Sequence, residues 1–157
     1  MKNHPTCVVH APSLGLVKLC EPILRSLPGW FGIEEAIVWY LKKVDELPTL
    51  LATVDDKPVG FLTYERFRSH SSELLVMGVL PGWHRKGIGR ALIERAEILL
   101  RGEGVEFVQV KTLSDSHPDP GYAKTRAFYL ALDYRPLQEF PLLWGPQNPC
   151  LQMIKRL

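Results

Sequence analysis

Residues 77–90 join a strand-like run, a tight loop with two glycines and the start of an amphipathic helix. The first amides of a helix have no partner within it and lie at the positive end of its dipole, so they bind phosphate well. Gly87 and Gly89 would let an anion approach the backbone closely. Three neighbouring side chains add positive charge: Arg85, Lys86 and Arg90. The pattern favours a pyrophosphate site.

The glycines of this segment are also compatible with an ordinary turn or with a nucleotide-binding motif. A lone G-x-G occurs in many turns before helices, so the glycines alone do not decide the matter. A dinucleotide fingerprint would need a third glycine where Leu92 stands, and a Walker loop would need Lys followed by Ser or Thr, which Lys86 lacks. Both of these nucleotide-binding motifs fail.

The elements that must position this segment are predicted from hydrophobic periodicity and from Gly and Pro breakers. Strands are expected at residues 6–10, 50–54, 59–67, 73–80, 107–113, 134–140 and 150–157. Helices are expected at residues 13–27, 33–47, 123–132 and from residue 87 to Gly102, with the first helix broken at Pro22. Residues 55–58 favour a hairpin reversal. The order predicts a mixed α/β fold with one crossover between neighbouring strands.

Composition narrows the class of protein. A chain of 157 residues, 46% hydrophobic and 23% charged, predicts one globular domain over residues 1–157. A net charge of +2 disfavours nucleic-acid partners, and the three cysteines lack the spacing of a disulfide framework or a zinc site. No run approaches the roughly 20 apolar residues of a membrane span, and no signal-peptide core is visible. A cytoplasmic protein without a membrane partner is expected.

Two motifs resemble the GNAT N-acetyltransferase family. Val79-Leu80-Pro81 and the run from His84 to Gly89 resemble its acetyl-CoA motif, V-x-P then Q/R-x-x-G-x-G/A, with His84 where Gln or Arg is usual. Residues 125–134 are similar to its later F/L-Y-x-x-x-G-F/Y helix and strand, with Asp133 in place of glycine. The resemblance covers nearly the whole chain. It implies the GNAT fold, a central mixed and mostly antiparallel sheet flanked by helices.

The resemblance also implies binding roles, with acetyl-CoA as the cosubstrate and no metal. The backbone of Met77 and Val79 would pair with the pantetheine arm like an added strand. The loop residues that would hold the pyrophosphate are His84, Arg85, Lys86, Gly87, Ile88, Gly89 and Arg90. Tyr122 stands where many members carry an Asn that bonds pantetheine. Trp30 and Phe31 would line the acceptor pocket, with residues 117–122 as a further wall.

Acetyl transfer to an amine needs a proton acceptor and a proton donor. By resemblance, Tyr129 stands where the family protonates the leaving thiolate, and Glu73 where several members carry a base. Each has a simpler interpretation: Tyr129 as a core aromatic residue, and Glu73 as an exposed residue at a strand end. His70 and His117 are weaker candidates for the base, because loop histidines are commonly only solvated.

The resulting hypothesis is an N-acetyltransferase that moves acetyl from acetyl-CoA to a primary amine by direct attack in a ternary complex. A noncatalytic acyl-CoA-binding or regulatory module on the same fold is the main alternative, against which Tyr129 argues. A nucleotide-binding domain ranks last, because no base or ribose contact is recognisable. The acceptor, a small molecule or a peptide amine, is not specified by these residues. Whether the chain forms a homodimer stays open.

Overall fold

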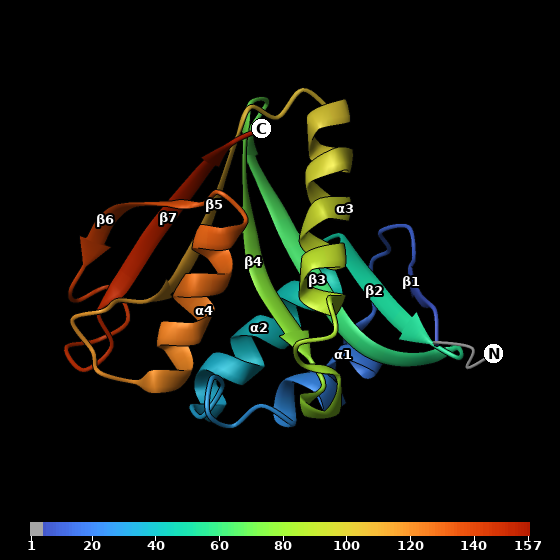
Figure 1. Ribbon diagram of the computed structural model, residues 1–157, viewed down its shortest axis with the longest axis horizontal. Coiled ribbons are helices and arrows are strands. Elements are labelled where there is room, and N and C mark those ends of the chain that lie inside the picture. Colours follow the sequence, from blue (N-terminus) through green and yellow to red (C-terminus); the bar gives the residue numbers. More distant parts are fainter. Residues whose placement is uncertain (1–4) are drawn as a thin grey trace. The chain divides into compact units, whose positions relative to one another are not determined.

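A computed structural model describes residues 5–157, and it confirms the mixed α/β fold (Figure 1). The strands form a seven-stranded sheet in the order β1-β2-β3-β4-β5-β7-β6. The strands are β1 (Cys7–Val9), β2 (Thr49–Val54), β3 (Lys57–Arg68), β4 (Ser71–Val79), β5 (Phe107–Leu113), β6 (Arg135–Phe140) and β7 (Cys150–Arg156). The helices are α1 (Val17–Arg25), α2 (Glu34–Glu46), α3 (Ile88–Gly102) and α4 (Pro120–Ala131), with a short 3-10 helix at Pro81–Trp83.

The chain divides into two compact units. The described part of unit 1 comprises residues 5–65 and 74–99, and unit 2 comprises residues 66–73 and 100–157. The strand pairings inside each unit are antiparallel apart from the β4–β5 pair. Among the described residues, no helix combines the length and the apolar character that a membrane crossing requires.

In unit 1, helices cover both faces of β3 and β4. One core cluster joins buried residues of α1 and α2 to the sheet: Cys20, Ile23, Leu24, Ile37, Leu41, Val44, Leu51, Phe61 and Val76. Gly60 lies beside Phe61 on β3, and a Cβ at Gly60 would point to the other face, within 3.0 Å of Ile88 and 3.3 Å of Leu92. Because neighbouring residues of a strand face opposite sides, α1 and α2 pack on one face and the start of α3 on the other.

The predicted β2–β3 hairpin is confirmed. Asp55 and Asp56 both take left-handed backbone angles, with φ of 49° and 62°. Such angles fit a tight two-residue reversal, and Asp tolerates them better than most residues. The hairpin therefore forms where the residue types indicate, although β3 begins at Lys57 rather than at Val59.

The expected crossover runs from β4 through α3 to β5, which pairs with β4 in parallel. Ser71, Ser72 and Glu73 pair with Phe107, Val108 and Gln109. These three residues of β4 belong to unit 2, as β5 does.

In unit 2, β7 lies between β5 and β6 and pairs antiparallel with both. Helix α4 packs against β5, and the Arg126 guanidinium donates to the Leu113 carbonyl over 2.8 Å. The helix closes with Asp133 in the left-handed region, φ 69°, where the sequence places Asp in the position usually held by glycine. Asp133 therefore serves as the expected cap.

Two sequence-based helix predictions need correction. Helix α1 is continuous through Pro22, because the proline removes a single backbone bond while Cys20, Ile23 and Leu24 bury the apolar face. Helix α4 begins at Pro120 rather than at residue 123. Asp119 caps it by accepting from the Tyr122 amide, and proline is well suited to the first helical position.

Candidate functional site

The end of β4 directs backbone groups away from β3 in unit 1. The Leu80 amide donates to the Val59 carbonyl of β3 over 2.8 Å. Since successive residues of a strand direct their backbone groups to opposite sides, Val79 and Met77 direct theirs away from β3. Both residues are half-buried. This edge has the donors and acceptors that an extended amide chain needs in order to add as a strand.

His84 already occupies one of these backbone groups. Its Nε2 atom donates to the Val79 carbonyl over 2.6 Å, which places the proton on Nε2. The imidazole also meets the Trp30 ring edge to face, with 5.9 Å between centroids. His84 thus bonds the loop to the end of β4, and through Trp30 it contacts the segment between α1 and α2.

The loop before α3 has the shape expected of an anion site. Arg85 and Gly87 take left-handed φ values of 60° and 80°, so the backbone reverses twice just before the helix. The Ala91 amide bonds the Gly87 carbonyl over 3.0 Å. By helix geometry, the amides of residues 88–90 precede the first intrahelical bond. Backbone of this kind forms a concave group of N–H donors suited to phosphate.

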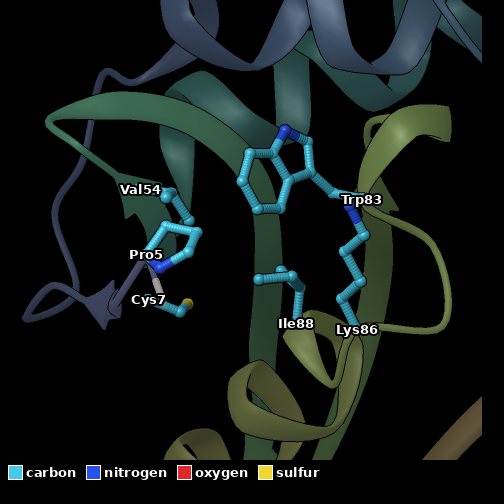
Figure 2. Close-up of a pocket in the computed structure, with 6 residues that line it drawn as sticks. All are labelled: Pro5, Cys7, Val54, Trp83, Lys86 and Ile88. Atoms are coloured by element: carbon cyan, nitrogen blue, oxygen red, sulfur yellow. The ribbon is translucent and has the colours of Figure 1, made fainter. Parts of the chain in front are cut away.

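The basic side chains of the loop have defined partners. The Lys86 ammonium lies 4.8 Å from the centre of the Trp83 ring, and Arg90 forms an ion pair with Glu94 over 2.8 Å. Figure 2 shows Trp83, Lys86 and Ile88 around a cavity of about 330 Å³. Three residues complete its lining: Pro5, Cys7 and Val54. Ile88, the first residue of α3, is buried.

Glu73 is buried, so its interpretation as an exposed strand-end residue is wrong. Its side chain is 4% exposed, and its Oε1 lies 3.1 Å from the Lys111 ammonium in unit 2. The thiol of Cys150, fully buried on β7, shares this environment. Burial raises the Cys150 pKa to about 11, while Lys111 acts to lower it and Glu73 to raise it. The carboxylate lies in an environment of opposite charge and little water.

Tyr129 lies half-buried on α4 among aromatic rings of unit 2. Its ring meets Phe128 at 5.4 Å and Tyr134 at 5.8 Å between centroids, both at steep angles. Its carbonyl accepts from the Leu132 and Tyr134 amides, which closes the helix. These contacts hold the ring in place, as both the catalytic and the packing interpretations require.

The remaining predicted site residues are placed as follows. Phe31 packs against the unit 1 core and meets Tyr40 edge to face at 5.7 Å, so it is partly structural. Trp30 is 36% exposed and can contact a ligand. Tyr122 is half-buried in the first turn of α4. His117 accepts the Asp119 amide on Nδ1 over 3.2 Å, while the carbonyl of the exposed His70 accepts two amides.

A model of the acetyltransferase (GNAT) family matches residues 19–131, which include the loop, β4 and all of α4. The chain belongs to the GNAT acetyltransferase family. No curated protein matches the sequence. Within residues 5–157, no three His, Cys, Asp or Glu side chains gather as metal ligands would.

Solved GNAT structures share the fold at low identity. A GNAT-family protein from Desulfovibrio desulfuricans is 19% identical with a TM-score of 0.82, over 96% of this chain and 99% of that one. The ribosomal-protein-S18-alanine N-acetyltransferase of Escherichia coli is 16% identical with a TM-score of 0.75, over 96% and 94%. The PaiA N-acetyltransferase of Thermoplasma acidophilum, solved with coenzyme A, is 16% identical with a TM-score of 0.76, over 97% and 99%.

Sequence reasoning missed Lys111 as a possible part of the site of this GNAT protein. A signal for it existed: Lys111 interrupts a strand whose neighbouring positions, Val108, Val110 and Leu113, are apolar and buried. A charged residue in such a strand needs a partner of opposite charge. The sequence could not indicate which carboxylate that partner is.

Proposed function

We propose that this protein is an acetyl-CoA-dependent N-acetyltransferase acting on a primary amine. The observation that carries the proposal is the loop before α3, where Arg85 and Gly87 take left-handed angles and free amides follow. Membership of the GNAT family supports acetyl-CoA as the ligand of this loop, with the diphosphate on the amides of residues 87–90. The edge of β4 at Met77 and Val79 would bind the pantetheine arm.

The proposed reaction is direct attack by the acceptor amine on the thioester. Glu73 takes a proton from the acceptor ammonium, the free amine attacks the acetyl carbon, and a C–N bond replaces the C–S bond. Tyr129 donates a proton to the departing thiolate, and the second proton that the nitrogen loses as the amide forms restores the Tyr129 hydroxyl. A backbone amide near Met77 would stabilise the developing oxyanion. A donor that the fold already holds in place costs little reorganisation energy when the negative charge forms. Trp30 and Phe31 would contact the acceptor.

A substitution at Gly89 tests the binding step. Gly89→Glu places a carboxylate among the amides that would hold the phosphates, so repulsion should abolish coenzyme A binding measured by calorimetry. Gly102→Glu is the matched control, since it changes the net charge equally at the far end of the same helix. A Cβ at Gly102 has no atom within 4 Å, so this variant should fold and bind like wild type.

Two results would overturn the proposal. If folded wild-type protein shows no saturable binding of coenzyme A, the proposed cosubstrate is wrong and the proposed function fails with it. Binding without release of thiol from acetyl-CoA, across polyamine, aminoglycoside, amino-acid and peptide amines, would favour the noncatalytic module instead. Thiol release that depends on one amine class would establish the transferase and identify the acceptor class.

A further inference from the structure

The Glu73–Lys111 pair lies inside unit 2, where two parallel strands meet. Glu73 of β4 stands opposite Gln109 of β5, and Lys111 follows two residues later on the same face. The Lys111 ammonium reaches the Glu73 carboxylate at 3.1 Å. The lysine side chain remains 30% exposed while that of Glu73 is only 4% exposed. The lysine end of the pair is therefore solvated, and the carboxylate end is not.

Lys111 compensates for the burial of the Glu73 carboxylate. A charge that is removed from water and left without a partner is very unfavourable, so a buried carboxylate needs an opposite charge beside it. The Cys150 thiol cannot compensate for the charge, since it carries none, and it stays protonated up to its pKa of about 11. Lys111 supplies the positive charge next to the carboxylate.

We propose that Lys111 is a positioning residue for the base: its ammonium, 3.1 Å from the buried Glu73 carboxylate, holds that carboxylate in the orientation that accepts the acceptor's proton. This inference rests on the proposed function. Lys111 transfers no proton itself. The acceptor ammonium gives its proton to Glu73, and the resulting carboxylic acid then stands beside a cation. The proton then passes to water at the solvated end of the pair, which regenerates the base for the next turnover.

A double-mutant cycle on turnover tests the inference. The probes are acetyl-CoA and whichever of spermidine, kanamycin or a peptide with a free N-terminus wild type acetylates fastest. We expect Glu73→Gln and Lys111→Met each to lower kcat by about 10²-fold with little change in the KM for acetyl-CoA. The double variant should be no slower than Glu73→Gln alone, since both substitutions remove the same base. Lys111→Arg should restore most of the activity.

The pH dependence separates this role from a purely structural one. Both single variants should approach wild-type turnover as the pH rises from about 6.5 to about 9.5, where the acceptor amine is increasingly deprotonated in solution. Lys111 and Cys150 are ionisable groups that approach Glu73 from neighbouring strands. The Cys150 thiol, with its pKa of about 11, stays neutral over this range. A variant that was merely misfolded would lose activity at every pH.

The matched control is Lys43→Met. Lys43 forms an ion pair with Glu65 in unit 1, and its side chain is 26% exposed, close to the 30% of Lys111. This variant removes a comparable lysine and should leave kcat unchanged. If Lys111→Met fails to fold, the double variant replaces both charges together, which buried pairs tolerate better than the loss of one partner.

Three results would overturn the inference. These are wild-type kcat in Lys111→Met, wild-type kcat in Glu73→Gln, and losses that simply multiply in the double variant. Failure of the proposed function looks different, because wild type itself would then release no thiol with any of the probe amines. Where Lys111→Met does not fold, a double variant slower than Glu73→Gln contradicts the inference, and equal rates support it.

Discussion

Alanine at Gly78 tests how closely α1 packs on the strand that carries the proposed cofactor edge. A Cβ at this position would lie 3.0 Å from Phe61 Cε1 and 3.3 Å from both Ile23 Cγ2 and Leu27 Cδ1. Such distances are shorter than normal carbon contacts, so at least one neighbour must move. Overpacking of a core typically costs about 1–3 kcal/mol. Alanine in a strand recovers about 0.5–1 kcal/mol of that cost relative to glycine.

The net expectation for Gly78→Ala is a loss of roughly 1–2 kcal/mol in unfolding free energy. For a chain of this size, that loss lowers the melting temperature by about 2–8 °C. Thermal unfolding followed by circular dichroism measures it. Gly29→Ala is the matched control, because a Cβ at Gly29 has no atom within 4 Å, and its melting temperature should hardly change.

A second substitution shows whether the crowding is the cause. Leu27 supplies one of the three close atoms, so Gly78→Ala combined with Leu27→Ala should be less destabilised than the sum of the two single variants. Wild-type stability in Gly78→Ala, or strictly additive losses in the pair, would refute the close packing of α1 and the following Leu27 against β4.

Two further predictions concern Tyr129 and Cys20. Tyr129→Phe keeps the ring contacts but removes the hydroxyl, so turnover should fall by roughly 10²-fold while acetyl-CoA affinity holds; wild-type turnover would contradict the acid role. Burial raises the Cys20 pKa from 9.0 to about 12, so above about pH 9 the unfolded thiol ionises while the folded one does not, and stability falls as the pH rises. At about pH 10 this contribution is about 1.4 kcal/mol. Urea unfolding of Cys20→Ala should show a shallower alkaline decline than wild type, and equal slopes would contradict the burial.

Much of the fold could be predicted because its signals are local. The reversal at Asp55 and Asp56, strand β5 and helix α3 all follow from residue types and periodicity within a few positions. The errors arose where local rules compete. At Pro22 the burial of three apolar neighbours outweighs one lost hydrogen bond, and the start of α4 depends on the Asp119-Pro120 cap, a signal that the apolar pattern overshadowed.

In the candidate site, the backbone contacts could be predicted from the sequence, but the side-chain contacts could not. The cofactor loop could be predicted because a strand, two glycines and a helix start already determine where its amides lie. The environment of Glu73 could not be predicted in this way. Its partner Lys111 comes from another strand, and the β4–β5 register brings the two side chains together. His84 shows both cases: its position in the motif follows from the sequence, but its bond to the Val79 carbonyl does not. Because that carbonyl belongs to the edge proposed for pantetheine, cofactor binding must either share it with His84 or displace the imidazole. A carbonyl oxygen has two lone pairs, so sharing requires no movement of the loop.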